Sequence, residues 1–256
     1  MTTMTTPIAL QLYTLRDLLA QDYEGTVRKV ADLGYVGVET ANMFGDSPAS
    51  ATKLFRELGL TVTSAHSALP LGDKKQEVID TLKVLNCNRL ILPGAPHEMY
   101  QSLDGIRRLC DSLNEASVVA KANGFTVGYH NHWIEYKPVE NRLPADVMLE
   151  HLDPDVFFEV DVYWVQTAGW DPAEVVRRLG ARAPFLHIKD GPCQDDAPMT
   201  ALGEGLVDIP SIVAAGAGST EWLVVELDEC ATDIMEAVRK SYQYLVDKGL
   251  GRGTKT

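Results

Sequence analysis

Eight short runs of apolar and β-branched residues recur along the chain, and longer segments with helical spacing of apolar positions separate them. The runs cover residues 8–14, 35–40, 60–66, 89–94, 125–132, 156–164, 185–190 and 222–227. This alternation is typical of repeated βα units around a parallel sheet. Because no linker rich in proline, glycine or serine interrupts it, we predict one domain over residues 1–256, a single (β/α)8 TIM barrel of the α/β class.

The intervening segments carry apolar residues three and four positions apart, which predicts helices over 23–33, 49–58, 73–85, 100–123, 171–179 and 233–248. Glycine follows several of these segments, as in Leu33-Gly34 and Asn123-Gly124, where the end of a helix favours a left-handed residue. An open doubly wound sheet usually has a glycine-rich turn after its first strand, and the stretch LQLYTLRDL has none. A closed barrel is therefore the better interpretation.

The formal net charge of −13 at pH 7 argues against two classes of partner. A negative field repels phosphate backbones and anionic lipid surfaces, so we expect neither a nucleic acid nor a membrane as a ligand. The first residues, MTTMTTPIAL, lack the regions of a signal peptide, and no run approaches the roughly 20 apolar residues of a membrane span. These features predict a cytoplasmic protein, and they are compatible with a homo-oligomer.

The cysteines are scattered at positions 87, 110, 193 and 230, without a CxxC pair. This spacing argues against both a disulfide framework and a zinc site built from thiolates. We expect these residues to be buried or to lie in loops.

Polar side chains stand at the ends of most of the predicted strands. In barrels of this type the active site lies at the C-terminal ends of the strands, so these residues are candidates for function. They are Glu39, His66, His130, His132, Asp161, His187, Lys189 and Glu226. Imidazoles and carboxylates that converge there would be desolvated without a counter-ion, and a cation removes that cost. We therefore predict one divalent metal ion, of manganese, cobalt, zinc, iron or magnesium, because mixed ligands of these types do not choose among them.

Several motifs resemble those of a known superfamily over nearly the whole chain. They are YHNHWIEY (129–136), EVDVYWVQTAG (159–169), HIKD (187–190), LGEG (202–205) and VVELDE (224–229). With these motifs the chain resembles the xylose isomerase-like TIM barrels, which include sugar isomerases, ketose 3-epimerases, inosose dehydratases and, more distantly, endonuclease IV. The motifs are most similar to the branch of sugar phosphate isomerases and epimerases.

The resemblance implies a metal ion held by an acid from strand 5, an aspartate ending strand 6, a histidine from strand 7 and a glutamate ending strand 8. Asp161, His187 and Glu226 match the last three positions. On strand 5, where the epimerases carry glutamate, this chain has His130. His130 is one candidate for the fourth ligand, and Glu135, just past the strand, is the other.

Other residues near this set are candidates for supporting roles. Alternation along strand 5 puts His132 on the same face as His130, so both histidines, like Glu135, are candidates for acid–base catalysis. Glu159 lies one layer deeper than Asp161. We expect it either to orient His130 from behind or to form a buried salt bridge with a lysine or arginine.

Four further residues are expected to contact the substrate: Glu39, His66, Trp164 and Lys189. His66 matches a strand 3 histidine that contacts substrate in the superfamily. Lys189 shares the face of His187 and could hold a carbonyl or phosphate oxygen, whereas Asp190 is equally suited to cap a loop. Trp164, like Trp133 and Tyr163, is expected either to stack on a sugar ring or to pack in the core.

A metal ion at such a rim acidifies the C–H next to a carbonyl, so that a side-chain base can remove the proton. This step begins epimerisation, isomerisation and β-elimination. We predict a metal-dependent isomerase or epimerase acting on a small keto-sugar or cyclitol, with Glu226 as both ligand and acid–base group. The histidines of strand 5 also resemble those of inosose dehydratases, so a dehydratase-like or keto-glycoside lyase is the alternative. A sugar-binding barrel without turnover is the third possibility.

The endonuclease branch of the superfamily does not fit the residues. Its metal cluster needs histidines from strands 3 and 4, another three residues after the strand 6 aspartate, and an Asp-x-His in the following loop. This chain keeps only the first, because strand 4 ends in Leu92-Pro93-Gly94 and Trp164 stands three residues after Asp161. We therefore do not expect DNA repair.

Overall fold

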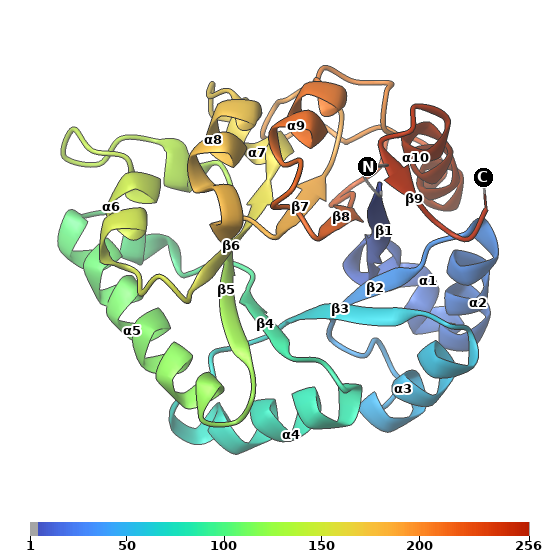
Figure 1. Ribbon diagram of the computed structural model, residues 1–256, viewed down its shortest axis with the longest axis horizontal. Helices are drawn as coiled ribbons and strands as arrows, with labels where there is room; N and C mark the ends of the chain where they lie inside the picture. The colour runs from blue at the N-terminus through green and yellow to red at the C-terminus, as the bar shows by residue number, and fades with distance from the viewer. Residues whose placement is uncertain (1–4, 256) are drawn as a thin grey trace.

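The computed structural model describes residues 5–255, and its strands form a closed barrel. All neighbouring strands of the barrel are parallel, and β1 closes it by pairing with both β8 and β2 (Figure 1). The strands are β1 (Thr6–Gln11), β2 (Gly37–Ala41), β3 (Thr61–His66), β4 (Arg89–Leu92), β5 (Thr126–His130), β6 (Phe157–Asp161), β7 (Phe185–Ile188) and β8 (Trp222–Val225). A two-residue strand, β9 (Gly251–Arg252), pairs with the start of β1 outside the barrel.

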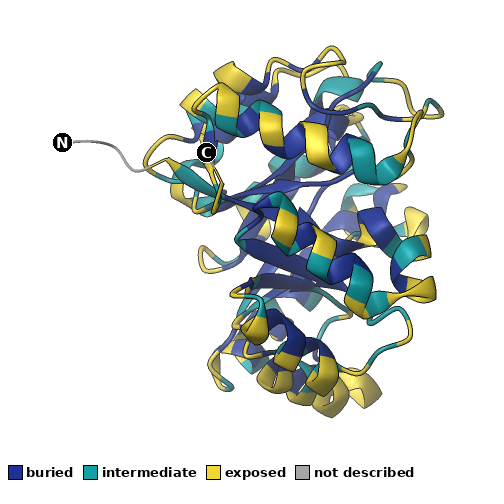
Figure 2. Ribbon diagram, turned by 90° about the vertical axis from the view of Figure 1, so that its right-hand side faces the viewer, coloured by how far each residue is buried: buried dark blue, intermediate teal, exposed yellow. Residues whose placement is uncertain are grey.

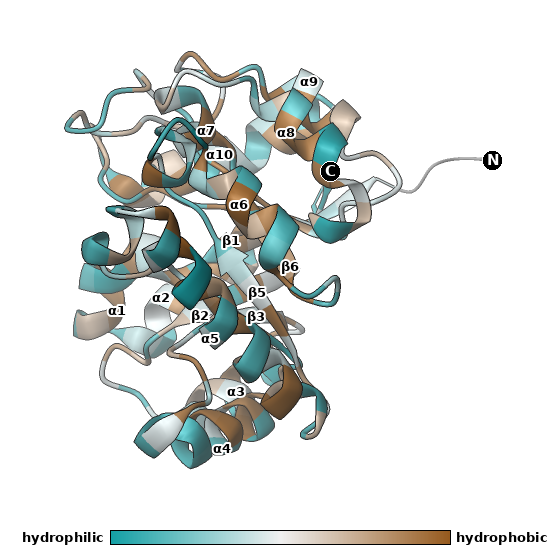
Figure 3. Cartoon of the chain, turned by 90° about the vertical axis from the view of Figure 1, so that its left-hand side faces the viewer, coloured by the Kyte–Doolittle hydropathy of each residue, from teal (hydrophilic) through white to brown (hydrophobic). Residues whose placement is uncertain are grey.

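Helices surround the barrel, as Figure 1 shows. They are α1 (Arg16–Gln21), α2 (Tyr23–Leu33), α3 (Pro48–Glu57), α4 (Lys75–Leu85), α5 (Leu103–Lys121), α6 (Pro144–His151), α7 (Val162–Thr167), α8 (Pro172–Leu179), α9 (Ile209–Ala215) and α10 (Ile234–Asp247). Hydrophobic and hydrophilic residues alternate along them (Figure 3), as expected when one face of each helix packs on the barrel. None of the helices in residues 5–255 is long and apolar enough to cross a membrane.

The strands lie at the centre of the molecule and are buried, whereas the outer sides of the helices are exposed (Figure 2). Most of the core packs between strands and helices. A second, small apolar cluster comes from the inner faces of five strands: Ala9, Ile91, Phe157, Phe185 and Val224. Side chains two residues apart on a strand share a face, so Glu159 follows Phe157 on the inner face, and His187 follows Phe185. The barrel interior thus becomes polar toward the C-terminal ends of the strands.

All eight predicted runs contain a barrel strand, but six of the strands end before the predicted run does, by two residues at β4, β5, β7 and β8 and by three at β1 and β6. The run over 156–164 was expected to be strand throughout, yet β6 ends at Asp161 and α7 begins at Val162. The reason is a helix cap, because Asp161 Oδ1 accepts a hydrogen bond of 3.0 Å from the Trp164 backbone N–H. Likewise β1 ends at Gln11, whose side chain accepts from the Tyr13 N–H and starts a 3-10 turn.

The segment between β7 and α9 is irregular, and Asp190 organises it. Its carboxylate accepts hydrogen bonds from four backbone N–H groups, those of Gly191, Gly203, Gly205 and Val207. A Cβ atom at Gly205 would lie 2.2 Å from Asp190 Oδ1, so this position of the LGEG motif requires glycine. Asp190 therefore caps the loop.

Candidate metal centre

Four side chains converge at the C-terminal ends of neighbouring strands. His130 ends β5, Asp161 ends β6, His187 lies in β7, and Glu226 directly follows β8. One potential ligand atom from each lies within 4.8 Å of the others, and all four residues are buried. This is the set predicted from the sequence with His130 as the fourth member.

Each imidazole of this set directs one nitrogen toward a carboxylate of the set and the other toward a deeper carboxylate. His130 Nε2 lies 3.7 Å from Asp161 Oδ2, and His187 Nδ1 lies 2.7 Å from Glu226 Oε2. The opposite nitrogens, His130 Nδ1 and His187 Nε2, lie 3.1 Å and 3.0 Å from Glu159 Oε2. A carboxylate behind a ligating imidazole fixes its tautomer and orientation. Glu159 has that position for both rings.

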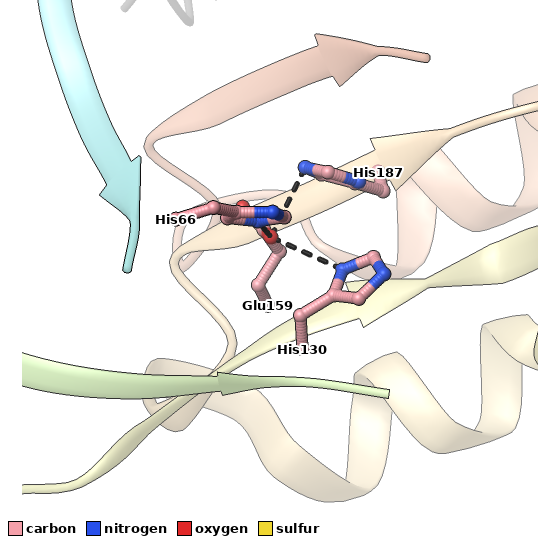
Figure 4. Close-up of side chains that lie close together, drawn as sticks. All are labelled: His66, His130, Glu159 and His187. Atoms are coloured by element: carbon pink, nitrogen blue, oxygen red, sulfur yellow. Dashed lines mark hydrogen bonds and ion pairs between the residues drawn. The ribbon is translucent and has the colours of Figure 1, made fainter. Parts of the chain in front are cut away.

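Glu159 is also the centre of a second, deeper group. Its Oε2 atom lies 2.7 Å from His66 Nε2, so three imidazoles surround one carboxylate oxygen (Figure 4). Together, His66, His130, Glu159 and His187 form another set whose ligand atoms lie within 4.8 Å of one another. Within residues 5–255, the ion pairs of Glu159 are with these imidazoles, not with a lysine or arginine. The contacts are those expected of a group that orients His130.

Glu39 contacts two of the three imidazoles that surround Glu159, those of His66 and His187. Its Oε1 atom lies 2.7 Å from His187 Nε2 and 3.1 Å from His66 Nε2, while Gln11 Nε2 and Ser64 Oγ donate to the carboxylate. Burial raises the pKa of Glu39, but the two imidazoles outweigh it and hold the pKa well below its usual range. Because Glu39 is fully buried among these partners, it lies behind the imidazoles and not at a surface open to substrate.

Lys189 is enclosed by carboxylates. Its ammonium lies 2.9 Å from Asp161 Oδ2, 2.7 Å from Glu226 Oε2 and 2.8 Å from Asp228 Oδ2, and the residue is fully buried. Burial lowers the pKa of Lys189, but the carboxylates raise it well above its usual value, so it stays charged. Burial also raises the pKa of Glu226, yet Lys189 and His187 lower it further than burial raises it. Lys189 thus acts as an internal counter-ion where the sequence suggested a substrate contact.

The imidazoles of His130 and His66 have different proton affinities. Burial lowers the pKa of His130 well below its usual value, and repulsion from the neighbouring His187 and His132 lowers it further. Burial also lowers the pKa of His66, but Glu39 and Glu159 raise it to about 10. His130 is therefore neutral at pH 7 and keeps a nitrogen lone pair that can coordinate a metal ion. His66, in contrast, carries a proton when no metal ion is bound.

Glu135 belongs to neither group. It is buried in a 3-10 turn, where its Oε2 atom accepts a hydrogen bond of 2.8 Å from the His132 N–H and its Oε1 atom accepts from the Tyr129 hydroxyl. Tyr100 in turn bonds to Tyr129. The structure therefore brings His130, and not Glu135, to the other candidate ligands. Glu135 instead holds the turn that carries His132.

A cavity of about 630 Å³ opens over the first set. Its walls include half of the polar residues that the sequence selected at strand ends, namely His66, His130, His132 and Glu226, together with Trp164. Trp133 is not part of this wall, and Tyr163 is fully buried, so Trp164 is the member of the predicted aromatic group that faces the main cavity. A volume of this size is typical of a site for a small molecule.

The cavity wall also contains residues that sequence reasoning missed: Tyr13, Arg16, Asp228 and Glu229. Asp228 had a signal in the sequence, because it stands two residues after Glu226 in VVELDE and alternation gives both side chains one face. Tyr13 lies in the 3-10 turn after β1 and Arg16 is the first residue of α1, and no motif marks either of them.

The residues present fit a divalent metal ion. Two carboxylates and two imidazoles are ligands that several divalent ions accept. Asp161 Oδ2 is buried without an aligned hydrogen-bond donor, although Lys189 Nζ lies 2.9 Å away. Because a buried carboxylate oxygen is costly when incompletely paired, a cation at this point would stabilise the set.

Known proteins similar to this chain include enzymes of sugar and cyclitol chemistry. An inosose dehydratase from Geobacillus kaustophilus is 25% identical over 200 residues, which is 69% of this chain and 64% of that protein. The match thus spans less than two thirds of that relative. Two solved structures of sugar phosphate isomerase/epimerases from Parabacteroides distasonis superpose with TM-scores of 0.78 and 0.80 at 25% and 26% identity. They cover 95% and 94% of this chain, and 94% and 98% of their own chains.

The fold, the convergence of polar residues at one end of the barrel and these similarities agree with a match to a protein family. The sequence profile of the xylose isomerase-like TIM barrels matches residues 27–247, which is most of the chain. Members with known activities include isomerases, epimerases and dehydratases. On this match, the protein belongs to the xylose isomerase-like TIM barrel family.

Proposed function

We propose that this protein is a divalent-metal-dependent isomerase or epimerase that removes a proton next to the carbonyl of a keto-sugar or cyclitol. The observation that carries the proposal is the set of His130, Asp161, His187 and Glu226, two members of which, His130 and Glu226, line the 630 Å³ cavity. Membership of a family of isomerases, epimerases and dehydratases supports it.

Of the two possible ligand sets, we assign the metal ion to the one that contains both Asp161 and Glu226. Glu159 can then hold the deeper nitrogens of His130 and His187, Nδ1 and Nε2, at 3.1 Å and 3.0 Å. This assignment also gives the incompletely paired Asp161 Oδ2 a cation. A metal ion in the deeper set would instead leave Asp161 with Lys189 alone.

The bound ion would polarise the carbonyl oxygen of the substrate and so acidify the neighbouring C–H. Glu226 lines the cavity and is the candidate base for that proton. Its lowered pKa makes it a weak base, so it depends on an acidified C–H. His132 and His66 line other parts of the same cavity and are candidates for returning a proton to the substrate.

One observation favours a second candidate function, β-elimination. An epimerase of the two-glutamate type needs opposed acids on strands 5 and 8, but His130 occupies the strand 5 position, and Glu135 is bonded to Tyr129 and the His132 N–H. Histidine can donate a proton to a leaving oxygen, as elimination requires. The similarity to an inosose dehydratase supports the same alternative.

The test is to incubate keto-sugars and inososes with the manganese-loaded protein in deuterated water. NMR then measures the incorporation of deuterium into the sugar. The proposal predicts that, with the wild-type protein, the NMR signal of the proton next to the carbonyl disappears. After treatment of the protein with a chelator, this signal should remain. Elimination would in addition produce an enone that absorbs in the ultraviolet. A folded, metal-loaded protein that binds these compounds without any exchange would be a sugar-binding barrel, and both enzymatic proposals would fail.

Glu226→Gln provides the matched variant. An amide oxygen can still coordinate a metal ion but takes no proton at neutral pH, so we expect exchange to fall far more than metal affinity. Exchange at the wild-type rate in a metal-loaded Glu226→Gln protein would exclude Glu226 as the base and transfer the role to a histidine of the cavity.

A further inference from the structure

A second cavity of about 440 Å³ adjoins the main cavity. It lies between the loop after β4 and the turn after β5, and we call it the side compartment. The two cavities share three wall residues, Pro93, Gly94 and His132, so they meet at the imidazole of His132. The candidate metal centre therefore lies on one side of His132, and the side compartment lies on the other.

Four of the ten wall residues of the side compartment carry aromatic rings. They include His97, Tyr100 and Trp133, with the edge of the His97 ring facing Trp133 at a centroid distance of 6.1 Å. Lys137 Nζ lies 4.0 Å from the centroid of the Trp133 ring and fixes the indole from one side. The faces of aromatic rings are electron-rich and attract the partly positive C–H groups on a sugar ring. The compartment thus has the chemistry of a carbohydrate subsite.

Gly94 sets the junction between the two cavities. Its φ angle of 140° lies in a region that residues with a side chain rarely adopt. A Cβ atom there would lie 3.4 Å from His132 Cε1, so the His132 ring rests against the bare glycine backbone. Glu135 holds the same histidine from the other side through the His132 N–H, at 2.8 Å. The wall between the cavities is therefore built to keep His132 in place.

We propose that the side compartment binds a second ring, joined through an oxygen atom to the keto-sugar in the main cavity, so that the preferred substrate is a glycoside and not a free monosaccharide. The placement of the keto-sugar rests on the proposed function. The main cavity alone has the volume of a small-molecule site, so a single sugar ring does not need the aromatic walls beyond His132.

The location of His132 adds a chemical consequence for the elimination reaction. The oxygen that links the two rings would lie at the junction, next to this imidazole. When a base removes the proton next to the carbonyl, the electron pair of the broken C–H bond forms a C=C bond, and the C–O bond to the second ring breaks. A His132 ring with protons on both nitrogens gives one of them to the departing oxygen, which leaves as an alcohol while the imidazole becomes neutral. The reaction needs no oxidant or reductant.

Calorimetric binding with manganese-loaded protein tests the proposal. The probes are D-fructose and three disaccharides that carry fructose with a second sugar at O3, O4 or O6, namely turanose, lactulose and isomaltulose. We expect at least one disaccharide to bind about tenfold tighter than fructose, because a stacked ring contributes about that factor. If none binds more tightly than fructose, the proposal is wrong.

Variants of Trp133 assign any preference to the side compartment. Trp133→Ala should remove the preference for the disaccharide while leaving fructose binding unchanged, and Trp133→Phe should retain most of it. The matched control is Trp170→Ala, because this half-exposed tryptophan lines neither cavity. A preference that survives Trp133→Ala in a folded protein, as judged by circular dichroism, would refute the proposal. Deuterium exchange is not part of this readout, so its failure would affect the proposed function alone.

Discussion

Lys189 offers a test of how charge is balanced in the barrel. Its ammonium lies 2.7–2.9 Å from three carboxylates, and Asp161 and Glu226 among them are buried. Lys189→Met retains the length and apolar stem of the side chain but leaves these carboxylates without their counter-ion. Removing one partner of a buried ion pair usually costs about 3–5 kcal/mol, so we expect a loss of that size in the metal-free protein. In a chain of 256 residues this corresponds to a fall in Tm of about 10 °C.

A bound metal ion should reduce this loss. The ion would supply positive charge to Asp161 and Glu226 and replace part of what the ammonium provides. Urea denaturation followed by circular dichroism, once with chelator and once with excess Mn²⁺, measures both values. We expect the difference between wild type and Lys189→Met to be clearly smaller with Mn²⁺ than with chelator.

Lys240→Met is the control, because Lys240 forms an equally short ion pair with Glu204, at 2.7 Å, on the protein surface. Solvent screens that pair, so we expect no measurable loss. The reasoning would be refuted if Lys189→Met were as stable as Lys240→Met in chelator. An equal loss with chelator and with Mn²⁺ would show that the ion does not share the carboxylates of Lys189.

Three further predictions follow from contacts in the barrel. Asp190→Ala removes the acceptor of four backbone N–H groups and should lower the free energy of unfolding by about 2–5 kcal/mol, measured in urea, with faster proteolysis of the loop; unchanged cleavage would count against this role. Gly128→Ala would put a Cβ atom 2.2 Å from the Phe157 ring and should cost about 1–3 kcal/mol; a protein as stable as wild type would contradict this. Glu135→Gln should change metal affinity less than twofold, as measured by calorimetry, and lower turnover through His132, whereas loss of the ion would make Glu135 a ligand.

Much of the fold could be predicted from local sequence patterns. The strands alternate with amphipathic helices, and the segments over 23–33 and 171–179 lie within one residue of α2 and α8. The end of β6 could not be predicted in this way, because β-branched and aromatic residues continue past Asp161 to Trp164 and no periodicity separates strand from helix there. The helix begins there because the side chain of Asp161 caps it. Helices α1, α7 and α9, of six or seven residues, are too short for a clear helical period.

The candidate site was predictable where strand alternation determines direction. His130, Asp161 and His187 were expected on the inner face at strand ends, and the structure brings them together with Glu226. The partners of Lys189 were not predictable, because they come from the ends of β6 and β8, far apart in the sequence. The orientation of Glu135 could not be predicted from the sequence either. It depends on a 3-10 turn and on a buried tyrosine hydroxyl, neither of which has a sequence signature.

The central claim is that one divalent ion binds at the strand ends through Asp161 and His187. Free Mn²⁺ gives a six-line electron paramagnetic resonance signal at room temperature that largely disappears on binding to protein. When Mn²⁺ is added to the metal-free wild-type protein, this signal should stay suppressed until about one ion has been added per chain. Asp161→Ala and His187→Ala, both folded by circular dichroism, should leave the signal undiminished from the first addition. Suppression to the same extent in wild type and in both variants would contradict the account.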